Sequence, residues 1–211
     1  MKRQIILGLL MILPCATSGV AQSPGKQPSS APGSATAADI RKVDFLNFTY
    51  HSSLCSREYG GKGIGKTVRV QAGEFKTKDV YFAVADDKIV YADVTGDGRE
   101  DAIVPIDCGA ITANFALSEI YIYTIQNGRA TLLAGINDKD MERDYRRHYP
   151  DAESYWGINE NGLRVKAGNL EIDVLADGPH ASPKYIVTLE YRVSGETLGL
   201  TGKPQRRSFG Q

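Results

Sequence analysis

The residues whose types and spacing are best suited to chemistry lie in one acidic loop, from Asp93 to Asp101. Oxygen-bearing side chains stand at positions 1, 3, 5 and 9 of this loop, and Gly98 stands at position 6, where the chain must turn sharply. Calcium takes about six to eight hard oxygen ligands, and a compact loop of this spacing can bring several of them to one point. The spacing therefore predicts a calcium site. Its expected ligands are the side chains of Asp93, Thr95, Asp97 and Asp101 and the backbone carbonyl of Arg99.

Two other interpretations of the acidic loop are an EF-hand and a plain turn. An EF-hand needs Glu at position 12 and a helix on each side. Here position 12 is Val104 and both flanks alternate like strands, so the loop is not an EF-hand. The second alternative is a plain acidic β-turn, because Asp and Gly are common turn residues whether or not a metal binds.

The loop resembles the strand-loop-strand calcium loops of FG-GAP (integrin-type) and VCBS repeats, whose pattern is Asp-x-[Asp/Asn]-x-Asp-Gly-x-x-Asp. Here Thr95 replaces the usual carboxylate or amide, so the resemblance implies a lower affinity. The loop occurs once, and one copy cannot build a propeller. More broadly, the segments Asp44–Tyr50 and Val90–Gly98 with Cys108, Tyr121 and Tyr123 are similar to small exported bacterial proteins of uncharacterised function. That similarity implies no activity.

The start of the chain has the pattern of an export signal. Lys2 and Arg3 precede the apolar run Ile5–Leu13, and small residues follow up to Ala21. This order is typical of a removable signal peptide, and the apolar run is too short to span a membrane. We therefore expect a periplasmic or secreted protein. Lipoprotein anchoring through Cys15 is the less favoured alternative, because Pro14 is not the small residue expected before a lipidated cysteine.

The composition divides the chain into four parts. Residues 1–21 are the expected signal peptide, and residues 22–38, rich in Ser, Pro, Gly and Ala, are expected to form a disordered linker. Residues 39–202 are long enough for one domain with a core, and residues 203–211 are expected to be a frayed tail. The formal net charge is zero, without the strongly basic footprint that nucleic-acid binding needs, so we expect no nucleic-acid partner.

Two cysteines, Cys55 and Cys108, remain after removal of the signal peptide. In an oxidising compartment an even pair is most simply one disulfide, which would close a loop of about 50 residues and contribute about 3–4 kcal/mol. The alternative is that one of them is a thiol nucleophile.

The periodicity predicts a mainly β fold, with α+β possible: a single antiparallel sheet or sandwich, one N-terminal helix and one late helix. The stripe of apolar residues over 35–50 predicts the first helix, and Asp138–His148 the second. Asn127-Gly128 and Asn161-Gly162 each stand between two strand-like runs, which predicts two tight hairpins. The other expected strands are Thr67–Gln71, Val80–Val84, Lys88–Ala92, Ala102–Ile106, Glu119–Ile125, Ala130–Ala134, Tyr155–Ile158, Leu163–Val165, Leu170–Val174 and Tyr185–Tyr191.

Aromatic and basic residues gather late in the chain and form a possible ligand surface for a sugar or a peptide. The alternative is that the tyrosines pack on the sheet while the arginines are solvated. The residues are Tyr145, Arg146, His148, Tyr149, Tyr155 and Trp156. Gly60–Thr67 also matches a phosphate-binding loop, but it lacks the strand before it and the helix after it that such a loop needs, which favours a plain Gly-rich loop.

These patterns favour an exported, non-catalytic binding or structural module with one structural calcium ion. The alternatives are an exported hydrolase with calcium as a scaffold and a carbohydrate-binding module. We expect a monomer without a transmembrane span, and a protein or glycan as its partner.

Overall fold

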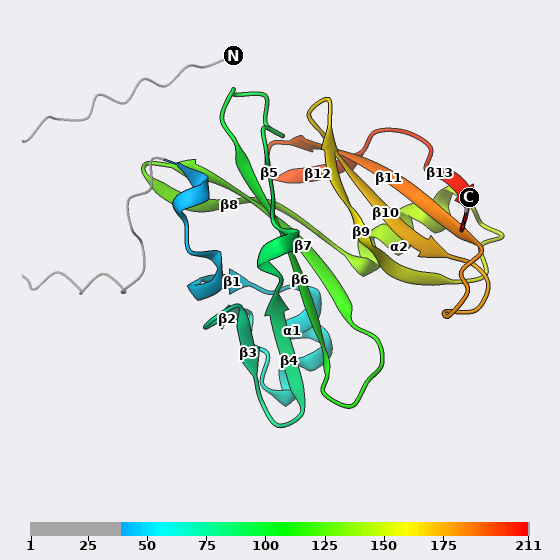
Figure 1. Cartoon of the computed structure of the whole chain (residues 1–211), viewed down its shortest axis with the longest axis horizontal. Helices are drawn as coiled ribbons and strands as arrows, with labels where there is room; N and C mark the ends of the chain where they lie inside the picture. Colours follow the sequence, from blue (N-terminus) through cyan, green and yellow to red (C-terminus); the bar gives the residue numbers. More distant parts are fainter. Residues whose placement is uncertain (1–38, 211) are drawn as a thin grey trace, which may run out of the picture. The chain divides into compact units, whose positions relative to one another are not determined.

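The computed structural model describes residues 39–210, and its core is built from two antiparallel sheets (Figure 1). The six-stranded sheet has the order β3-β4-β6-β7-β8, with β5 beside β6. The five-stranded sheet has the order β12-β11-β10-β9, with β13 beside β11. The helical elements are η1 (Ile40–Lys42), η2 (Phe45–Asn47), α1 (Leu54–Tyr59), η3 (Gly60–Lys62), η4 (Asp86–Lys88) and α2 (Asp138–His148). The strands are β1 (Thr49–His51), β2 (Thr67–Arg69), β3 (Glu74–Lys76), β4 (Val80–Val84), β5 (Val90–Ala92), β6 (Asp101–Ala110), β7 (Leu117–Gln126), β8 (Arg129–Asn137), β9 (Tyr155–Lys166), β10 (Asn169–Ala176), β11 (Tyr185–Ser194), β12 (Thr197–Leu200) and β13 (Gln205–Ser208). The prediction of a mainly β, antiparallel fold is confirmed.

The central strands β6 and β7 of the six-stranded sheet are buried on both faces. Along β7, Tyr121 and Tyr123 pack with the N-terminal elements, while the intervening Ile120 and Ile122 pack with β10, β11 and α2. Successive side chains of a strand point to opposite faces, so one strand supplies both cores. The N-terminal elements η1 to β2 form a third layer over the first face, and β1 and β2 pair only with each other. In the described residues no helix is long and apolar enough to cross a membrane.

The first of the two predicted hairpins is confirmed. Asn127 and Gly128 both have positive φ, at 50° and 73°, and the flanking residues Gln126 and Arg129 pair across the turn. Positive φ at both central residues is what a tight two-residue hairpin requires.

The second predicted hairpin is wrong, because Asn161 and Gly162 lie inside β9. A Cβ atom added at Gly162 would lie 2.6 Å from the carbonyl oxygen of Asp173 on the neighbouring strand. Glycine is therefore present for a close approach of two backbones, at a place where the register between β9 and β10 shifts.

The predicted helix over 35–50 is also wrong where the structure describes it. Asp39 accepts a hydrogen bond from the Arg41 amide, Asp44 accepts one from the Asn47 amide, and Val43 between them is extended. Each aspartate therefore caps the start of its own short 3-10 turn, and the extended backbone at Val43 separates the two turns that replace the helix. The late helix is confirmed as α2, capped by Asn137.

The end of the chain is more ordered than expected. The segment predicted to fray contains β13, which pairs with β11 from Tyr185↔Ser208 to Thr188↔Gln205. Backbone hydrogen bonds hold this strand without the apolar alternation that strand predictions use. The predicted signal peptide, linker and Cys15 anchor lie outside the described residues.

Candidate functional site

The acidic loop is the turn between β5 and β6, which pair from Val90↔Ile103 to Ala92↔Asp101. Asp93, the first residue of the loop, accepts hydrogen bonds from the amides of Gly96 and Gly98 at 2.6 and 2.9 Å. These bonds hold the pKa of Asp93 below its usual value, the Gly98 amide contributing most. Asp93 thus fixes the turn from inside and keeps its negative charge.

The second acidic residue of the loop, Asp97, is engaged by a basic neighbour. Its carboxylate accepts hydrogen bonds from the Arg99 amide at 2.9 Å and from the Arg99 guanidinium at 2.6 and 3.1 Å. The guanidinium lowers the pKa of Asp97. Both side chains are exposed, so in this arrangement Asp97 is neutralised within the loop.

The last acidic residue of the loop, Asp101, is different because it is fully buried. Its Oδ2 accepts a hydrogen bond from the Val94 amide at 3.2 Å, and its Oδ1 has no partner of good geometry among the described residues. Burial raises the pKa of Asp101, and the nearby hydroxyls of Thr124 and Thr95, with the Val94 amide, oppose the rise. A buried carboxylate oxygen without a partner is costly, so this atom calls for a ligand.

The Thr95 hydroxyl lies at the centre of the loop. It donates a hydrogen bond to Asp93 at 3.3 Å, and it also lowers the pKa of Asp97 and Asp101. The predicted side-chain ligands therefore face one region. In the described part of the chain, however, no group of three or more His, Cys, Asp or Glu side chains is arranged to hold a metal ion. A cation would require Asp97 to turn away from Arg99.

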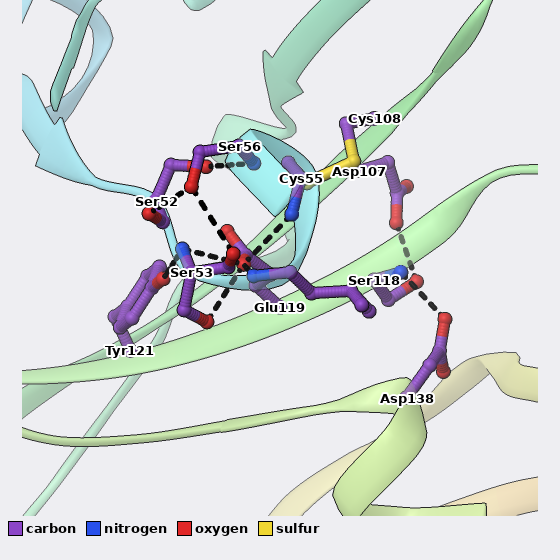
Figure 2. Close-up of a disulfide and its surroundings, with 11 residues drawn as sticks. Ser52, Ser53, Cys55, Ser56, Asp107, Cys108, Ser118, Glu119, Tyr121 and Asp138 are labelled. Carbon is purple, nitrogen blue, oxygen red and sulfur yellow. Dashed lines mark hydrogen bonds between the residues drawn. A yellow bond between two sulfur atoms is a disulfide. The ribbon is translucent and has the colours of Figure 1, made fainter. Parts of the chain in front are cut away.

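The predicted disulfide is confirmed between Cys55 of α1 and Cys108 of β6, and both residues are fully buried. Figure 2 shows the bond at the start of α1, with Glu119 beneath the helix. The bond attaches the N-terminal layer to the six-stranded sheet. It leaves no free thiol in residues 39–210, since these are the two cysteines there.

Glu119 of β7 is a buried carboxylate that the sequence analysis did not identify. Its Oε1 accepts hydrogen bonds from the Ser53 amide and hydroxyl, both at 2.9 Å, and from the amides of Leu54 and Cys55. The first amides of a helix have no partner within the helix, and an acidic group there is also favoured by the helix dipole. Glu119 therefore caps α1 from a neighbouring strand (Figure 2).

The adjacent Ser118 points to the other face of the sheet (Figure 2). Its hydroxyl donates to Asp107 at 2.8 Å, and its amide donates to Asp138, the first residue of α2, at 2.6 Å. Asp138 also accepts a hydrogen bond from the Tyr155 hydroxyl at 2.8 Å. Burial raises the pKa of Asp138 to about 6. Asp107 and Ser118 line a pocket of about 70 Å³ beside β9, which has room for a few water molecules.

The predicted aromatic surface divides into separate parts. Tyr145 is fully buried and Tyr149 is half-buried, and both rings stack on Arg206, whose guanidinium carbon lies 3.8 Å from the Tyr149 centroid. Arg206 also bonds the Tyr145 hydroxyl at 2.6 Å and lies 3.3 Å from the Asp177 carboxylate. The chain's own arginine thus occupies these aromatic faces.

The remaining members of that set face elsewhere. Arg146 pairs with Glu142 at 3.0 Å, and His148 lies half-buried at the end of α2. Tyr155 turns to Asp138, whereas Trp156 is 37% exposed and its ring meets His180 edge-on at 5.3 Å. Of the predicted surface residues, only Trp156 is available as an open aromatic face.

A larger pocket, of about 320 Å³, borders the acidic loop. Its wall includes Thr124, which faces Asp101, together with Arg99 and Glu100 of the loop. Glu100 is bound by Arg41 at 2.8 Å and Arg99 by Asp97, so these charged groups have partners.

No protein-family model, curated protein sequence or solved structure matches this chain.

Proposed function

We propose that the chain is an exported, β-rich binding or structural module whose β5–β6 loop binds one calcium ion. The ion would be structural and would fix the turn between the two strands. The ligands would be the side chains of Asp93, Thr95, Asp97 and Asp101 and the carbonyl of Arg99.

The observation that carries the proposal is the buried carboxylate of Asp101. It is fully buried, its Oδ1 has no partner of good geometry, and no ion pair reaches it from the rest of residues 39–210. A buried charge is normally paired or bound to a metal, because desolvation disfavours the charged form. A calcium ion in the loop would supply both the missing charge and the missing partner.

The chemistry of the donor set supports calcium over softer metals. The predicted ligands are carboxylate, hydroxyl and carbonyl oxygens, and hard cations prefer oxygen. Binding would require Asp97 to exchange its three hydrogen bonds from Arg99 for the ion. That exchange lowers the affinity, in the same direction as the neutral Thr95 oxygen.

The disulfide supports export, because such bonds persist mainly in oxidising compartments. The proposed location is the periplasm or the extracellular space. The proposed role of the module is to bind a protein or a glycan, with the loop as part of its scaffold.

Calorimetry on the purified protein, with the disulfide intact and all metal removed, tests the proposal. We expect one calcium per chain, and calcium at 100 times its Kd should raise the free energy of unfolding by about 2.7 kcal/mol. Magnesium should bind more weakly, because it demands a tighter octahedral site.

Two variants separate the loop from the general surface charge. Asp101→Asn should abolish calcium binding, whereas Glu100→Gln, one residue earlier and paired with Arg41, should leave it unchanged. Absence of heat and of any stabilisation in the wild-type protein would sink the proposal, as would unchanged binding in Asp101→Asn.

An exported hydrolase is the second candidate function. It is favoured by the pair of carboxylates Asp107 and Asp138, which meet across Ser118, and by the raised pKa of Asp138. The small pocket beside them places it second, since it has room for water and not for a substrate. Hydrolysis of a panel of glycoside and ester substrates that is lost in both Asp107→Asn and Asp138→Asn would reverse the order.

A further inference from the structure

One end of the six-stranded sheet combines exposed apolar and basic side chains. The tip of the β6–β7 hairpin, residues 111–116, carries Ile111 and Phe115, which are 45% and 57% exposed. Phe115 is the most exposed of the large hydrophobic residues in the described chain. Neither side chain belongs to the two hydrophobic cores, so both are available for a contact outside the chain.

Two other segments lie beside this tip. The amide of Ile111 donates to the carbonyl of Asp79 at 2.8 Å, which places the β3–β4 turn next to it. The hydroxyl of Thr77 in that turn reaches the carbonyl of Lys62 at 3.4 Å, which brings in the Gly-rich loop after α1. Figure 1 shows the turn, the loop and the hairpin tip at the lower end of the sheet.

The charge of this end is mainly positive. The Gly-rich loop carries Lys62 and Lys66 and the β3–β4 turn carries Lys78, all of them exposed, against the single acid Asp79. In the described chain none of these three lysines forms an ion pair, unlike Lys76, which binds Glu74 at 2.8 Å. Their charges are therefore free to meet an anionic surface.

The first two glycines of the Gly-rich loop are also suited to contact with a surface. Cβ atoms added at Gly60 and Gly61 would meet nothing within 4 Å, and neither residue has positive φ. Neither packing nor backbone geometry explains these two glycines. A backbone without side chains, however, can lie close to a flat surface.

We propose that this end, defined by residues 60–66, 77–79 and 111–116, docks on an anionic lipid surface. Ile111 and Phe115 would enter the boundary between headgroups and acyl chains, and the three lysines would lie at the level of the acidic headgroups. An anionic membrane is favoured over a protein groove because the apolar side chains stand at a hairpin tip, next to segments that carry three lysines without ion pairs. The inference is independent of calcium.

Co-sedimentation of the purified protein, disulfide intact, with lipid vesicles tests the proposal. The vesicles would contain phosphatidylcholine alone or with about a third of phosphatidylglycerol. We expect binding to the mixed vesicles only, weakened several-fold between about 50 and 300 mM salt, because screening reduces the attraction of surface charges. No binding to the mixed vesicles would overturn the proposal.

Matched variants locate the contact. Phe115→Ser should weaken the partition about tenfold, whereas Phe209→Ser, which removes a phenylalanine 47% exposed elsewhere, should not change it. The double change Lys62→Gln with Lys78→Gln should weaken it about tenfold or more, and Lys139→Gln with Lys166→Gln, on α2 and β9, should have little effect. Equal losses in test and control variants would overturn the assignment of this surface.

The same variants would also reveal whether a second copy of the chain, and not a membrane, binds this end of the sheet. If the protein dimerises without lipid, and Phe115→Ser abolishes the dimer seen by sedimentation velocity, the end contacts a second copy and the lipid proposal is overturned. Circular dichroism confirms that each variant is folded.

Discussion

Two buried aspartates near strand ends, Asp101 and Asp177, are treated very differently by the fold. Asp101 begins β6, and Asp177 follows β10; each is at most 5% exposed. Asp177 accepts hydrogen bonds from the amides of Glu153 and Ser154 and from the Tyr145 hydroxyl, and it lies 3.3 Å from Arg206. Asp101 has one amide donor and no cation in the described chain.

The difference shows where the fold supplies a counter-charge itself. For Asp177 the cation arrives from β13, at the far end of the sequence, and three tyrosine rings surround it. For Asp101 the closest arginine in the sequence, Arg99, is engaged by Asp97. The fold thus completes Asp177 from within the chain, whereas the described residues supply no counter-charge to Asp101, which is why we propose a ligand there.

We expect the largest loss of stability when Arg206, the cation beside Asp177, is replaced. Arg206→Met should lower the free energy of unfolding by about 3–5 kcal/mol, because it leaves Asp177 buried without a counter-charge. Arg207→Met is the control: it removes a half-exposed arginine from Asp173, which keeps Arg164, and should cost at most about 1 kcal/mol. Urea denaturation of both variants measures the difference, and equal losses would contradict the contrast drawn for Asp177.

Asp138 lies between the two cases, since it has hydrogen-bond donors but no cation partner in the described residues. Its pKa is raised from 3.8 to about 6 in the folded protein, so the folded state binds the proton more tightly than the unfolded state. Its contribution is therefore fully present below about pH 4 and is lost as the pH rises through 6, with a total of about 3 kcal/mol.

The measurement is the stability difference between wild type and Asp138→Asn, followed by urea denaturation from pH 4 to pH 7. The wild type should lose about 2.5 kcal/mol relative to the variant over that range, because part of the total is already lost at pH 4. A pH-independent difference would show that Asp138 ionises normally in the fold.

Replacing Asp101 should raise the free energy of unfolding, whereas replacing Arg206 should lower it. With calcium removed, Asp101→Asn should stabilise the protein by about 1 kcal/mol, because it removes an uncompensated buried charge and retains an acceptor for the Val94 amide. The corresponding Asp177→Asn should destabilise it, because Arg206 loses its partner. Thermal denaturation in a chelator compares the two, and a loss of stability in both would refute the distinction.

The smallest effect concerns the competition for Asp97. Arg99→Gln should raise the affinity for calcium about three- to tenfold, because Asp97 no longer has to leave a guanidinium. Arg41→Gln, which frees Glu100 and not a proposed ligand, should leave the affinity unchanged. Calorimetric titration decides, and equal affinities in wild type and Arg99→Gln would mean that Arg99 does not compete with the ion.

The fold was predictable where local pattern and tertiary pairing agree. The strongest predicted strand became β7, and Asn127-Gly128 became a tight turn. Asn161-Gly162 has the same sequence but stands inside β9, because a glycine needed for close backbone approach looks identical to one needed for a turn. β13 was missed because backbone pairing with β11, and not side-chain pattern, holds it.

The candidate site was predictable only in part. The spacing of oxygen-bearing side chains identified the acidic loop, and the even number of remaining cysteines identified the disulfide. Glu119, Asp138 and Asp177, by contrast, looked like ordinary surface acids. A signal did exist for Glu119, since an acid at the start of the most apolar strand must find donors. The donors themselves come from residues 53–55, more than 60 positions away, which no local pattern reveals.

The disulfide has a further consequence for the acidic loop. Cys55 and Cys108 enclose residues 93–101 within one covalent ring. A protease that cuts this exposed turn, for example after Arg99, would divide the backbone without releasing either piece. The nicked molecule would migrate as a single chain until a reductant is added. Cleavage of this loop, with and without added calcium, can therefore be followed on a reducing gel while the molecule stays in one piece.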